Sequence, residues 1–209
     1  MRAVTPLRLL SLVLAGALLA GACSSSSDDE ADAGPAAEED AGSEDAFPVT
    51  ITHAFGETEI TEPPERVVTW GWGSADAAIA LGVVPVAIPF QEYGGDEQGV
   101  LPWIREALEE QGAELPEILP NTEEAPVEAI AAAEPDLILA AYSGLTEEEY
   151  ELLSDIAPVV AYPEEAWSTP WRDLIEIVGT ALGRRDEAAA LLDEIDAELA
   201  AQAEAHPEL

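Results

Sequence analysis

From Phe47 onward, short apolar runs alternate with segments of helical periodicity, and this alternation limits the folds open to the chain. The apolar runs lie at residues 67–70, 83–88, 136–141 and 158–161. Helices are expected between and after them, at residues 75–81, 103–110, 126–133, 146–156 and 171–182. Strands that alternate with helices of this length are typical of a parallel sheet with helices on both faces. We therefore expect an α/β, Rossmann-like lobe.

Two further elements flank this lobe. Residues 47–53 alternate in polarity, a turn follows at 54–57, and residues 58–60 return, which predicts an N-terminal β-hairpin. A long helix is expected at 186–205, with one apolar face made by Ala189, Leu192, Ile195 and Leu199. We place the lobe at residues 47–185 and the helix at 186–209, and we expect this helix to connect the lobe to a part that the chain lacks.

Capping residues predict where several helices begin and end. Ser74 is a candidate N-cap for the first helix, and Pro126 is expected in the first turn of the third. Thr146 with Glu149 three residues on predicts a capping box. Gly82 and Gly183 are expected just beyond helix ends.

The N-terminal residues have the pattern of a secretion signal. Arg2 and Arg8 form a positive region, residues 9–19 form an apolar stretch, and small residues precede Cys23, the one cysteine of the chain. The stretch is shorter than the ~20 residues of a transmembrane helix. A cysteine at this place resembles the bacterial lipobox, so we expect a signal peptide at 1–22 and lipidation of Cys23. An ordinary secretory peptide with an incidental cysteine is the alternative.

Residues 23–46 are rich in serine and acidic side chains and contain no aromatic residue. Such a segment buries too little apolar surface to offset the entropy of ordering, so we expect a disordered acidic tether. A tether between a lipid and a folded body suits a protein that works just outside a membrane.

The chain is strongly acidic, with 44 Asp and Glu residues against 7 arginines and no lysine. Binding to nucleic acid needs a basic surface, so this balance argues against a nucleic-acid partner. It argues equally against docking on anionic lipid by charge. We interpret the excess as charge spread over the whole surface, which favours solubility.

Aromatic residues follow the predicted strands at the points where each strand ends. Ligands of parallel α/β sheets bind beyond the carboxyl ends of the strands, and an exposed apolar patch usually marks a binding surface. Packing under loops is the alternative for any single ring. We expect the following residues to bind a ligand: Trp70, Trp72, Tyr93, Tyr142, Trp167 and Trp171.

Catalytic patterns are weak. His53 lies in the predicted hairpin and His206 near the last residue, so neither a Ser-His-Asp set nor a histidine-rich metal site can form at the strand ends. Residues 71–76 imitate a dinucleotide-binding turn, but Asp76 stands where the third glycine should be and would repel a pyrophosphate. We expect no enzymatic activity and keep a nucleotide-dependent enzyme as a distant alternative.

Several ordered motifs resemble the iron–siderophore (Fe/B12-type) substrate-binding lipoproteins of ABC importers. They are the segments 66–76 (RVVTWGWGSAD), 80–86 (ALGVVPV), 130–138 (IAAAEPDLI) and 142–146 (YSGLT). Residues 158–162 (PVVAY), followed by 167–171 (WSTPW), resemble the actinobacterial branch of this family. The resemblance implies two α/β lobes joined by one long helix, of which this chain has the N-terminal lobe and the connector.

The resemblance also implies a function. The protein would capture a ferric siderophore outside the membrane, anchored there by lipid, and deliver it to an ABC permease. No metal ligand or cofactor is needed, because the iron arrives already chelated. Ferric catecholates are strongly anionic ligands that bind best to a cluster of arginines, and arginines are scarce in this chain. A neutral or cationic hydroxamate complex therefore fits better, and cobalamin and haem are the alternatives within this fold.

The predicted anchor can be tested by replacing Cys23 with alanine. Two or more acyl chains hold a protein firmly, since each buried CH₂ contributes about 0.8 kcal/mol. Loss of the acylated thiol should release the protein into the medium, which fractionation and immunoblotting would detect. A Cys23→Ala protein that stays with the membranes as fully as the unaltered one would contradict the lipid anchor.

Overall fold

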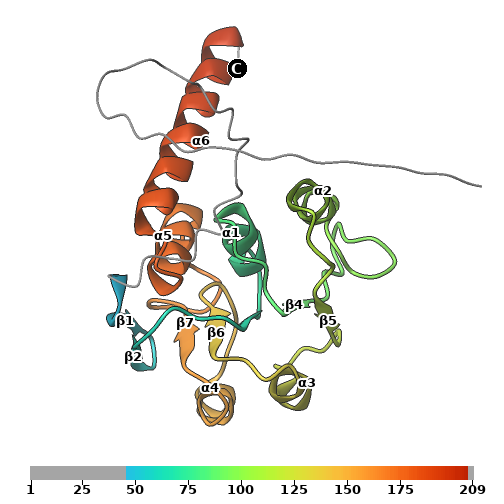
Figure 1. The fold of residues 1–209 in the computed structure, drawn as a ribbon, viewed down its shortest axis with the longest axis vertical. Helices are drawn as coiled ribbons and strands as arrows, with labels where there is room; N and C mark the ends of the chain where they lie inside the picture. Colours follow the sequence, from blue (N-terminus) through green and yellow to red (C-terminus); the bar gives the residue numbers. More distant parts are fainter. Residues whose placement is uncertain (1–45, 207–209) are drawn as a thin grey trace, which may run out of the picture. The chain divides into compact units, whose positions relative to one another are not determined.

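The computed structural model describes residues 46–206, so the predicted signal peptide, Cys23 and nearly all of the tether lie outside the described residues. Five short strands form one parallel sheet in the order β5-β4-β3-β6-β7 (Figure 1). The strands are β3 (Val67–Thr69), β4 (Ala87–Pro89), β5 (Glu117–Leu119), β6 (Leu137–Ala140) and β7 (Val159–Ala161). The predicted α/β class is confirmed.

Helices cover both faces of the sheet. The helices α1 (Ser74–Ala80), α2 (Pro102–Gln111) and α5 (Trp171–Ala181) lie on one face, and α3 (Val127–Ala132) and α4 (Glu147–Ser154) on the other (Figure 1). Successive strand residues point to opposite faces. Val67 accordingly packs in the core with α1 and α5, whereas Val68 packs with α3 and α4. The chain adds β4 and β5 on one side of β3 and then β6 and β7 on the other, which is a doubly wound topology.

Two strands differ from the sequence prediction. The strand expected at 83–88 begins only at Ala87, because Pro85 has no N–H to donate and the Val83 N–H bonds back to α1 at Ala78 O (2.9 Å). The strand β5 was not predicted at all. It has three residues between two prolines, which is too short to show a period.

Helix termini partly follow the predicted caps. Thr146 caps α4 in a complete capping box with Glu149, as expected. The prediction for Ser74 is wrong: the N-cap of α1 is Gly73, in a left-handed conformation, and Ser74 is the first helical residue. Pro126 is likewise the N-cap of α3 and not part of its first turn.

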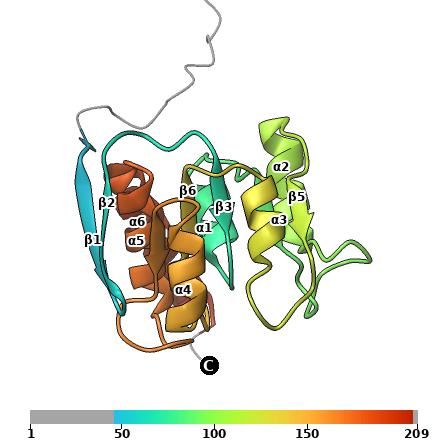
Figure 2. The same cartoon turned by 90° about the horizontal axis from the view of Figure 1, so that it is seen from below.

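The predicted hairpin is present and packs beside β7. Its strands are β1 (Val49–His53) and β2 (Gly56–Ile60), joined by a two-residue turn. The Ala54 N–H donates to Tyr162 O (2.9 Å) and the Thr58 hydroxyl donates to Val159 O (2.6 Å). Figure 2 shows the hairpin at the end of the sheet opposite β5. These hydrogen bonds occupy backbone carbonyls in and just after the edge strand β7.

The long helix α6 (Arg185–Ala205) lies against α5. Its packed face is made by Ala188, Leu191, Leu192 and Ile195. Of the predicted apolar face, Leu192 and Ile195 thus pack against the lobe, whereas Ala189 is exposed and Leu199 is 54% exposed. The role of α6 as a link between lobes stays a prediction. Among the described residues, no helix is long and apolar enough to cross a membrane.

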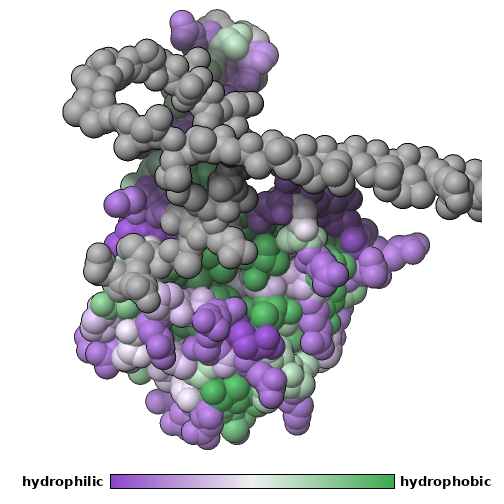
Figure 3. Space-filling model, in the orientation of Figure 1, coloured by the Kyte–Doolittle hydropathy of each residue, from purple (hydrophilic) through white to green (hydrophobic). Residues whose placement is uncertain are grey.

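On the face seen in Figure 3, hydrophilic side chains surround apolar residues near its middle.

The hairpin contains a buried histidine in a fixed protonation state. The Thr58 hydroxyl donates to Val159 O, so it accepts a hydrogen bond from His53 Nε2 (2.9 Å). The Phe55 N–H donates to His53 Nδ1 (3.2 Å), and the ring also packs against Tyr150. With Nδ1 as an acceptor the ring is neutral, and desolvation by burial lowers the pKa of His53.

Acid should therefore destabilise the protein through His53. The folded pKa lies below the ordinary value of 6.5, so the unfolded chain binds more protons in the window between them. The stability contribution is present above pH 6.5 and is lost as the pH falls through that window. Urea unfolding at about pH 7.5 and about pH 5.5 should show a larger stability loss for the unaltered protein than for His53→Gln. Equal losses in the two proteins would contradict a neutral His53.

Candidate ligand-binding site

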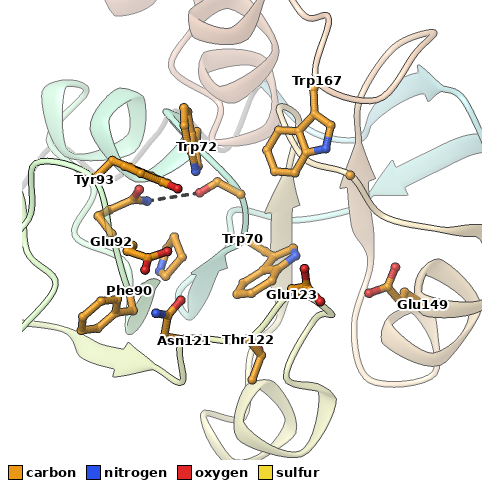
Figure 4. A pocket seen from close by; sticks show the side chains of 14 residues that line it. Trp70, Trp72, Phe90, Glu92, Tyr93, Asn121, Thr122, Glu123, Glu149 and Trp167 are labelled. Carbon is orange, nitrogen blue, oxygen red and sulfur yellow. Dashed lines mark hydrogen bonds between the residues drawn. The ribbon is translucent and has the colours of Figure 1, made fainter.

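A cavity of about 390 Å³ lies beyond the carboxyl ends of the strands (Figure 4). Each strand of the sheet has a following segment that contributes to its wall, which places it where parallel α/β sheets bind ligands. Its residues are Trp70, Gly71, Trp72, Pro89, Phe90, Gln91, Glu92, Tyr93, Asn121, Thr122, Glu123, Gly144, Glu149 and Trp167.

Four of the six predicted ligand-binding residues line this cavity: Trp70, Trp72, Tyr93 and Trp167. The Trp72 ring lies 6.1 Å from the Trp167 ring and 6.4 Å from the Tyr93 ring, measured between centroids. Trp72 and Trp167 are each 50% exposed and Tyr93 is 74% exposed. We call Trp70, Trp72, Tyr93 and Trp167 the aromatic wall.

The other two predicted residues lie differently. Tyr142 is not part of the cavity lining but meets Trp167 edge to face, with centroids 5.7 Å apart. Trp171 is outside the lining as well; it begins α5, and its ring packs against the Arg172 guanidinium, 4.0 Å from the ring centroid.

The turn from β3 into α1 presents Trp72. The Trp70 N–H donates to Leu139 O (2.8 Å) and the Trp72 N–H donates to Tyr142 O (2.9 Å), so the chain keeps its pairing with the β6 side beyond the end of β3. Gly71 lies between them with φ 87°, and a Cβ there would overlap the Tyr142 carbonyl oxygen. Only glycine fits this close approach in a left-handed conformation.

A tightly bonded loop after β4 carries Tyr93. The Asp96 carboxylate accepts hydrogen bonds from Arg105 Nε and from the N–H groups of Gln98 and Val100. The Arg105 hydrogen bond, helped by those two backbone bonds, lowers the pKa of Asp96 to about 2. The Asp96 carboxylate therefore stays charged at ordinary pH, and its hydrogen bond to Arg105 connects this loop to α2.

Carboxylates supply the charge around the cavity. Glu92, Glu123 and Glu149 line it, and no arginine, lysine or histidine does so among residues 46–206. Partial burial acts to raise the pKa of Glu149, but hydrogen bonds from the Thr146 N–H, the Ala125 N–H and the Thr146 hydroxyl outweigh it and lower the pKa. Glu149 is thus a fixed negative charge.

Sequence reasoning missed the polar part of this lining. Asn121, Thr122 and Glu123 follow β5, the strand that has no visible period, and Glu92 was one more acid in an acidic chain. Recognising the strand β5 would have identified Asn121, Thr122 and Glu123, because they follow its carboxyl end.

The described residues give little support for a metal site or a nucleotide-binding site. The described residues contain no group of three or more His, Cys, Asp or Glu that could hold a metal ion. Asp76, which stands in place of the third glycine of a dinucleotide-binding turn, accepts a hydrogen bond from Trp103 Nε1 (2.7 Å). A carboxylate at the start of α1 leaves no anion site there.

The fold and the cavity define a ligand-binding α/β lobe. The sequence profile described as "periplasmic binding protein" matches residues 67–209. The chain therefore belongs to the periplasmic binding protein family.

Relatives of known name agree with this placement. The chain is similar to PiaA of Streptococcus pneumoniae TIGR4, whose complex with ferrichrome gives 42% identity, a TM-score of 0.72, and coverage of 76% of this chain and 52% of PiaA. A periplasmic solute binding protein of Mycobacterium smegmatis gives 40% identity, a TM-score of 0.69, and coverage of 76% and 55%.

A third relative comes from the curated proteins. The Fe(3+) dicitrate-binding periplasmic protein FecB of Escherichia coli K12 is 29% identical over 159 residues, which are 71% of this chain and 47% of FecB. The chain thus spans about half the length of the relatives it matches.

Proposed function

We propose that this chain belongs to the substrate-binding component of an ABC importer and captures a ferric siderophore outside the cytoplasmic membrane. The aromatic wall is the observation that carries the proposal. Half-exposed tryptophans around a concave site suit the organic shell of an iron complex, which needs apolar contact and a few polar groups for orientation. The chelator satisfies the iron itself, so a site without metal ligands is sufficient.

The charge of the cavity supports a hydroxamate complex. Glu92, Glu123 and Glu149 would repel an anionic ferric catecholate, and no basic side chain in the described lining would offset them. None of the five arginines among residues 46–206 lines the cavity, and two of them pair with carboxylates elsewhere, Arg105 with Asp96 and Arg172 with Asp196. A neutral complex escapes this repulsion, and a cationic one gains from the carboxylates and from cation–π contact with the indoles. Ferrichrome, the ligand in the PiaA complex, is a neutral trihydroxamate.

The same proposal covers the partners. Delivery to an ABC permease follows from membership of an importer, and lipidation of Cys23 would hold the protein at the outer side of the membrane. The relatives' descriptions as periplasmic proteins support a place outside the cytoplasm.

Tryptophan fluorescence titration tests the ligand class. We expect quenching by ferrichrome at lower concentration than by a ferric tris-catecholate, because the carboxylates repel the anion. Tighter binding of the catecholate would contradict the charge argument. Binding of cobalamin or haem but of no ferric siderophore would contradict the proposed function.

Two matched substitutions locate the binding. Trp72→Ala should weaken ferrichrome binding by about 1–4 kcal/mol, the usual loss when a packed ring is removed from a binding site. Trp103→Ala is the control, since Trp103 is 55% exposed but does not line the cavity. Equal affinity of the two variants would show that the aromatic wall does not bind the ligand.

A further inference from the structure

The indole of Trp167 lies in the space that a side chain at Gly144 would fill. A Cβ placed on Gly144 would overlap the indole nitrogen, and it would be 2.8 Å from Cε2 and 2.9 Å from Cζ2 of the ring. Real Cβ atoms do not approach ring atoms so closely, so the ring would have to move. Both residues line the cavity.

The backbone of Gly144 does not need a glycine. Its φ lies outside the left-handed region, in contrast to Gly71 and seven other glycines of the described chain. An alanine could adopt the same backbone conformation. The missing side chain at 144 therefore serves the neighbouring ring and not the turn itself.

Trp167 has the opposite property: its backbone is left-handed although it carries a large side chain. Its φ is 58°, a region that disfavours residues with a Cβ. The Trp167 N–H donates to Ser143 O (3.1 Å) and the nearby Thr169 hydroxyl donates to Ala141 O (2.6 Å). These bonds hold the loop after β7 against the end of β6 and direct the indole onto Gly144.

Burial does not explain this arrangement, because Trp167 is 50% exposed. A strained backbone that carries a half-exposed ring at the mouth of a cavity is typical of a site where the ring has a task. The ring meets Tyr142 and Trp72, with centroids 5.7 and 6.1 Å away, so its place completes the aromatic wall.

We propose that Gly144 is a positioning residue for the ligand site: its missing side chain is the seat of the Trp167 indole, and the left-handed backbone of Trp167 delivers the ring to that seat. The role in ligand binding rests on the proposed function. The seat itself is a property of the fold and can be tested without a ligand.

The test is Gly144→Ala, with unfolding and spectrum measured on the 209-residue chain and ferrichrome affinity measured on the longer two-lobe protein that the resemblance implies. We expect cooperative unfolding, because the backbone accepts alanine, together with a changed near-ultraviolet circular dichroism spectrum, because Trp167 leaves Tyr142 and Trp72. Ferrichrome affinity should fall about tenfold, as on loss of a packed ring. Gly82→Ala is the control: Gly82 has no atom near its missing Cβ and φ 79°, so this variant should lose stability and keep both spectrum and affinity.

A double-mutant cycle distinguishes a specific contact between residue 144 and the Trp167 indole from a general effect of the substitution on the fold. In a Trp167→Ala background the space at residue 144 is empty, so adding Gly144→Ala should change neither the spectrum nor the affinity further. An unchanged spectrum for Gly144→Ala alone, or an equal change in both backgrounds, would overturn the seat. A spectrum that changes as expected in a chain that binds no ferric siderophore would instead overturn the proposed function and leave the seat intact.

Discussion

The site depends on the pairing between β3, the central strand of the sheet, and its neighbour β6. The ladder does not stop where β3 ends: Trp70 bonds to Leu139, and Trp72 bonds to Tyr142 across a glycine that has no room for a side chain. This extension fixes two indoles of the aromatic wall to the most buried part of the fold. The loops after β4 and β7 then add Tyr93 and Trp167 around them, so the core determines where the proposed ligand surface lies.

The carboxylates in the cavity wall bear on which ligand charges the cavity can accept. Taking a charged ligand out of water is costly unless the protein supplies the opposite charge. The described wall supplies carboxylates, and Glu149 is held in its charged form by hydrogen bonds that also fix the start of α4. Under the proposed function, these carboxylates act on the choice of ligand because they repel anionic iron complexes. A neutral or cationic iron complex would contact the apolar rings and would avoid repulsion by the carboxylates.

The order of strands and helices could be predicted from the sequence because most elements are bounded by clear signals. Thr146 with Glu149 located one helix, and aromatic residues after strands located most of the aromatic wall, since every parallel strand ends at the same edge. Short-range sequence patterns failed where contacts between segments distant in the sequence determine the structure. Three residues of β5 show no period, so the polar wall after it was missed. Trp171 is near Trp167 in sequence, but it begins a helix and its ring contacts Arg172. The left-handed backbone of Trp167 is accompanied by hydrogen bonds from its loop to the segment just after β6, and no local pattern reveals such bonds.

Binding of an iron complex at the aromatic wall can be detected through the paramagnetism of high-spin ferric iron. Indole N–H signals would be recorded by NMR with ferrichrome and with its diamagnetic gallium analogue. We expect ferric iron to broaden the indole signals of Trp70, Trp72 and Trp167 beyond detection, while the signal of Trp103, which lies outside the cavity lining, survives. Loss of the Trp103 signal with survival of the other three would contradict it.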